Sequence, residues 1–455
     1  MPIARETSFG RRPRRAPLWP TLEAFLSDAG LFVLGAAGAY SVNLVGSLPG
    51  DEILLAPLLP VLLLTKGRRA FNSQYMWFYI LMGAWLFGTI VADSYFGIPA
   101  VSRMKGVARV VFFALDFIAL AICLNNRPRR MVVFALSIVA VMLFIARQFR
   151  GEFLTQWKFG LASSILILSL LASSYFYARR RYWICILISL ALAASNFVFA
   201  FRSQVVIVLV SAALTIPLLD RRGPSLGGRR ARGRNSLKVV ALLALAGGAV
   251  YLASQAIKFG VDRGFFEEGV AQKFQSQSEG KLGVLFGGRP ETLVAIQAIR
   301  DSPILGHGSF AIDQRYLSLK QDIQYEYGYT DTDNPEDIEN PTIPTHSHLT
   351  MAWVESGIFG GLLWIYVLVL TVRAVFRINL LRPALAPLYC YLLVNFIWDI
   401  LYSPFGNVNR IWGAYLILMS YGLLNTPVRE IVPTTMQRRT PYYPRRIVIR
   451  RYLGT

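Results

Sequence analysis

The chain contains twelve apolar stretches, each close to the roughly 20 residues that a helix needs to cross a bilayer. The interior of a bilayer offers no water to free backbone groups, so spanning segments of this kind form helices. The pattern therefore predicts an all-α polytopic membrane protein with about 12 transmembrane helices. The expected spans are 30–48, 51–65, 75–92, 107–124, 131–146, 160–178, 182–200, 203–219, 238–256, 349–372, 384–402 and 411–426.

The composition agrees with a membrane location. Hydrophobic residues make up 54% of the chain, charged residues make up 16%, and the mean hydropathy is +0.45. Soluble domains average about 25% charged residues. The formal net charge of +21 raises the alternative of a nucleic-acid partner, because a basic surface is the usual footprint of such a protein. The positions of the basic residues decide between these two explanations.

The basic residues follow the topology of a membrane protein. With the N-terminus placed in the cytoplasm, the cytoplasmic connectors and tails hold 31 of the 47 Lys and Arg residues. Eight of the remaining 16 lie in one long outer loop, where the positive-inside rule has little force. We therefore expect both ends in the cytoplasm, basic contacts with membrane lipids, and no nucleic-acid partner.

The expected organisation has five parts. A basic cytoplasmic tail with no evident cleavable signal peptide precedes nine spans, and a long outer loop then precedes three more spans and a second basic tail. The loop holds 14 of the 26 acidic residues, and its segment "GRPETLVAIQAIRDSPILGHGSF" has the apolar spacing of a helix followed by a Gly-rich turn. The parts are 1–29, 30–256, 257–348, 349–426 and 427–455.

Two arginines are candidate anion ligands. Arg202 stands alone at the outer end of two apolar spans, and Arg289 precedes Pro290 at an expected helix start. Each has an ordinary explanation: Arg202 as an interfacial arginine that reaches the lipid headgroups, and Arg289 as a surface or capping residue. The functional alternative is a phosphate clamp, because a guanidinium group binds phosphate oxygens in a bidentate manner.

Two of the three histidines in the chain, His346 and His348, precede an apolar span. They could cap the next helix, or act as a general base at the outer rim. A metal site with His307 and nearby acidic residues is a third alternative, but no HExxH motif or Cys cluster supports it. We therefore expect no metal and no cofactor. Asp116, Asp399 and Arg410 lie in or near the spans. They are interpreted first as members of structural ion pairs, with Asp399 and Arg410 paired across the outer "SPFGNVN" turn, and second as acceptor-site residues.

Three segments together resemble the O-antigen ligase and polymerase superfamily. They are the lone arginine of an outer connector, the segment "GRPETLVAIQAIRDSPILGHGSF", and "HSHLTMAWVESGIFGG". In the family pattern a His is followed nine residues later by Glu, and a G-x-x-G motif then opens a span. Here that register falls on His346, Glu355, Gly357 and Gly360.

The resemblance implies a GT-C-like glycosyltransferase of the bacterial inner membrane, with its active site on the periplasmic side. The donor would be a glycan on undecaprenyl pyrophosphate, and the acceptor a hydroxyl of lipid A-core (ligase) or of another lipid-linked repeat (polymerase). Arg202 and Arg289 would bind the pyrophosphate, and His346 would be the base of a metal-independent, inverting reaction. The family usually has Asn after this histidine, whereas Ser347 follows here, so His348 is a second candidate base.

A transporter or flippase of lipid-linked glycans is the alternative function. Transporters tend to carry ionisable residues near the bilayer midplane, often in repeated halves. In this chain the candidate arginines and histidines cluster at one rim, which favours the transferase.

Overall fold

A computed structural model describes most of the expected membrane region. The described residues are 22–43, 46–149, 153–199, 201–215, 290–326, 342–406 and 408–427, with a few positions between 248 and 263. Arg289 and almost all of the expected span 238–256 lie outside them.

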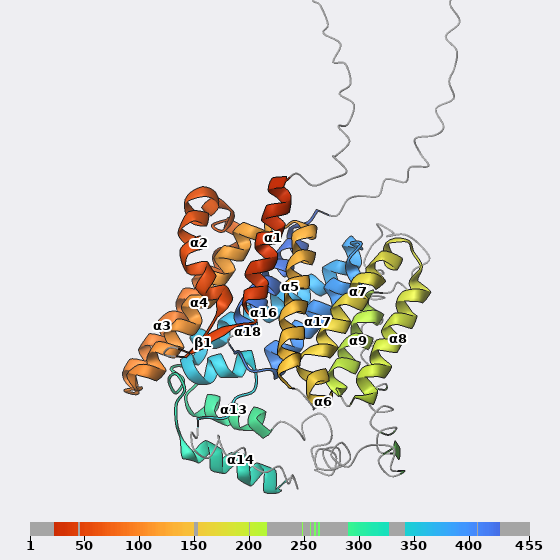
Figure 1. Cartoon of the computed structure of the whole chain (residues 1–455). Coiled ribbons are helices and arrows are strands. Elements are labelled where there is room, and N and C mark those ends of the chain that lie inside the picture. Colours follow the sequence, from red (N-terminus) through yellow and green to blue (C-terminus); the bar gives the residue numbers. More distant parts are fainter. Residues whose placement is uncertain are drawn as a thin grey trace, which may run out of the picture.

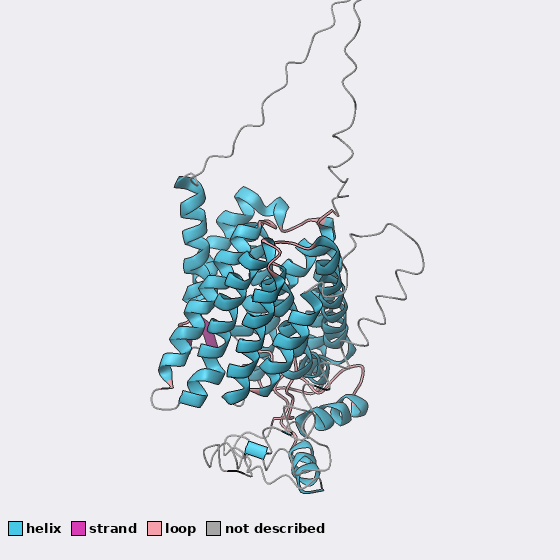
Figure 2. Ribbon diagram, turned by 90° about the vertical axis from the view of Figure 1, so that its right-hand side faces the viewer, coloured by secondary structure: helices cyan, strands magenta, loops and turns pink. Residues whose placement is uncertain are grey.

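Helices dominate the described part of the chain. In chain order they are α1 (Leu22–Ala37), α2 (Gly50–Lys66), α3 (Met76–Tyr95), α4 (Ala100–Leu124), α5 (Pro128–Gln148), α6 (Phe153–Gln156), α7 (Ala162–Ala178), α8 (Tyr182–Val198), α9 (Arg202–Thr215), α13 (Pro290–Asp301), α14 (Gln314–Glu326), α16 (His348–Leu381), α17 (Ala386–Tyr402) and α18 (Val408–Asn425). A π-helical turn, Trp157–Leu161, joins α6 to α7, and short 3-10 helices at Gly67–Arg69 and Ser73–Tyr75 join α2 to α3. Most of these helices run roughly parallel in one bundle (Figures 1 and 2).

Five segments of the described chain are helices long and apolar enough to cross a membrane. They are Ser73–Tyr95, Ala100–Leu124, Pro128–Gln148, Phe153–Ala178 and His348–Leu381. Shorter apolar helices, among them α8, α9 and α17, complete the bundle. The coarse prediction of a helical membrane protein is therefore confirmed.

The first expected span, 30–48, differs from the structure. The helix α1 begins earlier and ends at Ala37, and a two-stranded antiparallel hairpin of β1 (Ser41–Asn43) and β2 (Ser47–Pro49) follows it. The polar and turn-forming residues of "GAYSVNLVGSLPG" explain this end, because Gly, Asn, Ser and Pro are poor helix formers. Figure 2 shows the hairpin alongside the helices and not beyond them.

Two helices of the expected outer loop, α13 and α14, lie beyond one end of the bundle (Figure 1). Asp313 precedes α14 and accepts a hydrogen bond from the backbone N–H of Arg315 at 3.0 Å, as an N-cap residue does. The Arg315 guanidinium also bonds this carboxylate, and it holds the pKa of Asp313 below its ordinary value. The predicted helical content of the loop is thus present in its described part.

An aromatic core holds α3, α4, α16 and the loop before α18 together. Trp85, Phe113 and Trp364 are almost fully buried, and the Phe113 and Trp364 rings stack at 5.8 Å between centroids. Phe405 packs edge-on against Phe113 at 5.0 Å. This core lies directly behind the start of α16, where the candidate residues are found.

Glycine allows α3 and α16 to approach closely. A Cβ atom at Gly88 would lie 2.7 Å from the Cβ of Phe359 and 2.9 Å from the carbonyl oxygen of Ser356, whereas one at Gly83 in the same helix would meet nothing within 4 Å. Ala gains about 1 kcal/mol over Gly in a helix interior, and overpacking costs about 1–3 kcal/mol.

We expect Gly88→Ala to lower the midpoint of thermal unfolding in detergent, and Gly83→Ala to leave it unchanged or raise it. Circular dichroism of the two purified variants measures both values. Equal midpoints for the two variants would show that α3 and α16 leave room for a methyl group at Gly88, which would contradict the 2.7 Å approach to Phe359.

Candidate functional site

The helix α16 is broken at Gly357. This residue has φ +61° and ψ −153°, a conformation that L side chains rarely adopt, and it divides α16 into a short segment, 348–356, and a long one, 358–381. A side chain here would also collide with the carbonyl group of Ile304. Glycine is therefore required at this position for both conformation and space.

The Gly-rich turn of the outer segment docks on this break. The backbone N–H of His307 donates to the backbone carbonyl of Val354 at 2.7 Å, and the backbone N–H of Gly308 donates to the backbone carbonyl of Glu355 at 3.0 Å. The N–H of Ile358, freed by the break, donates to the carbonyl of Ile304 at 3.3 Å. The "SPILGHGSF" turn and the helix carrying "VESGIFGG" thus form one backbone-bonded unit.

A buried ion pair fixes this unit to α4. Nη1 of Arg109 donates to Oε2 of Glu355 at 2.6 Å, and the two side chains are only 7% and 12% exposed. The other carboxylate oxygen of Glu355 accepts from the backbone N–H of Phe310 at 3.4 Å, and the Arg109 guanidinium lies 4.5 Å from the centre of the Phe310 ring. One carboxylate therefore bonds both the bundle and the turn.

Asp93, at the end of α3, is a second anchor for the turn. Its carboxylate accepts hydrogen bonds from the backbone N–H of Ser309 at 2.6 Å and from the Ser309 hydroxyl at 3.0 Å. Any side chain at Gly106 of α4 would occupy the place of the Ser309 hydroxyl. Two membrane helices are thus shaped to receive the outer segment.

The two histidines have different environments. His346 is exposed and lies just before α16, whereas His348, the first residue of the helix, is 2% exposed. Nδ1–H of His348 donates to the carbonyl of Ser403 at 2.6 Å, and its ring packs edge-on against Trp364 and Phe405. Ser347, which lies between the two histidines, caps the N-terminus of α16: its hydroxyl accepts a hydrogen bond from the N–H of Thr350 at 2.8 Å.

A chain of hydrogen bonds runs from the first turn of α9 to His348. Nε2 of Gln204 donates to Oδ1 of Asn395 at 2.8 Å, and Nδ2 of Asn395 donates to Oδ2 of Asp399 at 2.8 Å. The hydroxyl of Ser403 donates to Oδ1 of Asp399 at 2.8 Å, and the carbonyl of Ser403 is the acceptor for His348. The chain brings α9, α17 and α16 together at one end of the bundle.

Arg202 is the first residue of α9 and is half-buried, two positions before Gln204. The structure therefore places three of the four predicted site residues, Arg202, His346 and His348, on segments that meet at this end. Arg289 lies outside the described residues; its neighbour Pro290 begins α13, which packs on α16. The convergence of Arg202, Arg289 and His346 on one cavity stays a prediction.

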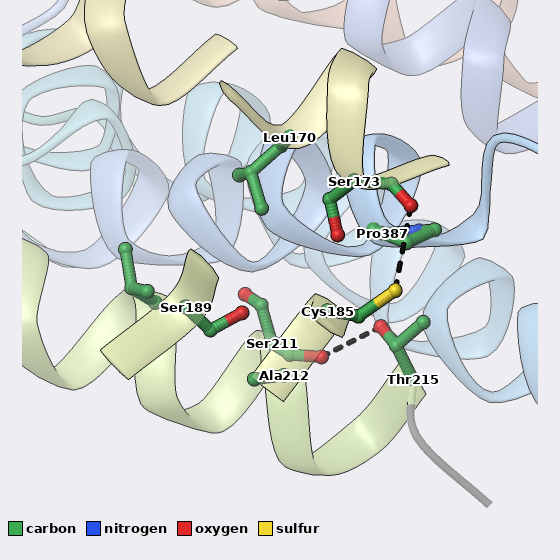
Figure 3. Close-up of a pocket in the computed structure, with 9 residues that line it drawn as sticks. Leu170, Ser173, Cys185, Ser189, Ser211, Ala212, Thr215 and Pro387 are labelled. Atoms are coloured by element: carbon green, nitrogen blue, oxygen red, sulfur yellow. Dashed lines mark hydrogen bonds between the residues drawn. The ribbon is translucent and has the colours of Figure 1, made fainter. Parts of the chain in front are cut away.

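A pocket within the bundle lies elsewhere (Figure 3). It is lined by residues of α7, α8, α9 and α17. The thiol of Cys185 donates to the backbone carbonyl of Ser173 at 3.4 Å, and the hydroxyl of Thr215 donates to the backbone carbonyl of Ser211 at 2.6 Å. Thr215 is the last residue of α9, about 20 Å from Arg202 at a rise of 1.5 Å per residue. This pocket is therefore not part of the candidate site.

The three residues expected in structural ion pairs within the spans differ in their contacts. Nε of Arg410 donates to Oε1 of Glu52 at 2.5 Å, and both side chains are buried. Asp399 belongs to the hydrogen-bond chain described above. Neither carboxylate oxygen of Asp116 has a hydrogen-bond partner within the described structure, so the prediction that it forms a structural ion pair is wrong at the level of direct contact.

The sequence does not predict a role for Asp93 or Arg109, nor the pairing of Arg109 with Glu355. Arg109 stands between apolar residues in "GVARVVFF", and a charge at such a position is costly unless it is paired. That cost marks Arg109 as a candidate for pairing. Nothing local to α4 indicates that its partner is a glutamate far along the chain, so the pair itself depends on the tertiary fold.

No family model matches the chain, and no curated protein matches it. Among the described residues, no group of three or more His, Cys, Asp or Glu side chains is arranged to hold a metal ion.

Removing one partner of a buried ion pair costs about 3–5 kcal/mol, because the other charge stays buried without compensation. We expect Arg109→Ala to lower the free energy of unfolding by an amount of this order, and the double variant Arg109→Ala with Glu355→Ala to be less destabilised than the sum of the two single variants. Chemical denaturation in detergent measures the three values. Arg103→Ala, on an exposed position of the same helix, is the control and should be nearly neutral. Strict additivity would contradict the coupling.

Proposed function

We propose that the chain is a membrane glycosyltransferase of the O-antigen ligase and polymerase superfamily, with a GT-C-like fold and about 12 transmembrane helices. One observation carries the proposal. Two of the three segments on which the resemblance rests are distant in sequence, yet they are joined by backbone hydrogen bonds at the Gly357 break. Such a junction gives a physical reason for the Gly and Glu positions of the pattern.

In the proposed reaction a glycan passes from undecaprenyl pyrophosphate to an acceptor hydroxyl. His346 takes the proton of this hydroxyl, the acceptor oxygen bonds to the anomeric carbon, and the bond from that carbon to the phosphate oxygen breaks. The pyrophosphate leaves with the bonding electrons. Arg202 and Arg289 stabilise the charge that develops on it, as fixed cations do at a leaving group. The acceptor is a sugar of lipid A-core or another lipid-linked repeat.

His346 is preferred to His348 as the base for two reasons. It has the nine-residue spacing to Glu355, and its exposed position leaves it accessible to a hydrophilic acceptor. His348 is enclosed by aromatic rings and bonded to Ser403, which suits a residue that fixes the start of α16. The position of His348 beside the polar chain from α9 keeps it as the second candidate.

The site is proposed to face the periplasm, in the bacterial inner membrane, with both termini in the cytoplasm. The distribution of Lys and Arg supports this orientation, and α13 and α14 lie at the end of the bundle where α16 begins (Figure 1). A polyprenyl donor then reaches the site from the outer leaflet, and a hydrophilic acceptor reaches it from the periplasm.

An assay with purified protein and a lipid-linked repeat tests the function directly. Growth of a ladder on the lipid carrier alone would identify a polymerase, and transfer only to added lipid A-core would identify a ligase. Absence of product with both acceptors, for a protein shown to be folded, would contradict the proposal. ATP-independent or ion-driven movement of the lipid-linked glycan across vesicles would favour the transporter instead.

A general base contributes about 100- to 10,000-fold to a rate. We expect His346→Ala to remove detectable product while the unfolding midpoint stays at the wild-type value. His348→Ala is the matched variant: it loses the bond to Ser403 and should lower the midpoint. Full activity of His346→Ala, together with an inactive but folded His348→Ala, would transfer the base role to His348.

The proposed clamp uses arginines where other phosphate-transfer sites use a divalent metal ion. We therefore expect activity to be unchanged by EDTA, measured as product formed after dialysis against the chelator. Loss of activity that returns on addition of a divalent cation would contradict the arginine clamp and reopen the role of the two histidines as ligands.

A further inference from the structure

A second group of buried charges lies inside the bundle, apart from the candidate site. Asp51 and Glu52 in the first turn of α2, Asp116 in α4 and Arg410 near the start of α18 are each at most 5% exposed. The charged groups that act on Asp116 are those of the other three residues. The cluster therefore brings three carboxyl groups and one guanidinium group together in a region that excludes water.

Two of the three carboxyl groups have a compensating partner. Glu52 pairs with Arg410 at 2.5 Å. Asp51 lies at the N-terminus of α2, where the helix dipole and free backbone N–H groups favour a negative charge. One oxygen of each carboxyl group still has no hydrogen-bond partner in the described structure, so both groups remain short of donors.

Asp116 has no such compensation. It lies in the middle of α4, away from either helix end, is 1% exposed, and neither of its oxygens accepts a hydrogen bond from the described residues. A buried carboxylate without a cation or donor is far less favourable than a neutral carboxyl group in the same place. Among the described residues the cation that acts on Asp116 is Arg410, and its guanidinium group is already bonded to Glu52.

We propose that Asp116 binds a proton, which makes this cluster a proton-binding site within the bundle. The proton comes from the solvent and bonds to one carboxylate oxygen, giving a neutral carboxyl group beside the Glu52–Arg410 pair. Release of this proton places a second anion near Arg410, where it competes with Glu52 for the guanidinium group. The protonation of Asp116 does not depend on the proposed reaction.

Infrared spectroscopy of the full chain in lipid nanodiscs tests the proposal. The C=O stretch of a protonated carboxyl group lies apart from that of a carboxylate and shifts on exchange into D2O. We expect wild-type protein at neutral pH to show such a band and Asp116→Asn to lose it, whereas Asp399→Asn should retain it. Absence of the band from the wild type, or its persistence in Asp116→Asn, overturns the assignment.

Thermal unfolding separates a proton from a metal ion and from a purely structural role. We expect Asp116→Asn and the apolar Asp116→Leu to keep the wild-type midpoint, because a protonated Asp116 carries no charge. We expect Glu52→Gln to lower the midpoint, because the ion pair between Glu52 and Arg410 is lost. Sodium and choline chloride should give equal midpoints. Stabilisation by sodium that Asp116→Asn abolishes would assign the site to a metal cation and overturn the proton. Failure of both Asp116 variants to fold would overturn it as well.

Discussion

The break at Gly357 is the constraint on which the rest of the described structure depends. A helix that continued unbroken would leave no free N–H for Ile304 and no room for the turn that follows α13. Because the backbone at Gly357 has a positive φ, α16 offers donors and acceptors on one side, and the outer segment completes them. The positions of α13 and α14 relative to the bundle therefore follow from one residue without a side chain.

Buried charges then determine which helices can surround this break. Glu355 bonds Arg109 of α4 and the backbone of Phe310, and Asp93 of α3 bonds Ser309 twice. A charge inside a membrane bundle is unfavourable without a partner, so each of these contacts specifies one arrangement and disfavours others. The Glu52–Arg410 pair fixes α2 to α18 by the same principle. Asp116 differs from these carboxylates because neither of its oxygens has a partner among the described residues, and a bound proton accounts for this.

Local patterns predicted much of the bundle and part of the site. Apolar length identified most membrane helices within a few residues. Rare charged or imidazole side chains at the rim marked Arg202, His346 and His348 as candidates, and their role in a site stays a prediction. The first span was misplaced because its apolar run includes the residues of a β-hairpin, whose pairing is a tertiary property. Asp93 and Arg109 were missed because their importance lies in contacts with residues hundreds of positions away.

The sequence by itself determined that this chain forms membrane helices, because a bilayer imposes a length and a polarity that can be counted along the chain. It also marked the histidine-to-glutamate spacing and the Gly-rich turn as special. Only the tertiary structure decided that these two segments bond to each other, that His348 is enclosed while His346 is exposed, and that Glu355 pairs with Arg109 and Glu52 with Arg410. Partner choice among buried charges depends on distances between helices, and no local pattern encodes those distances.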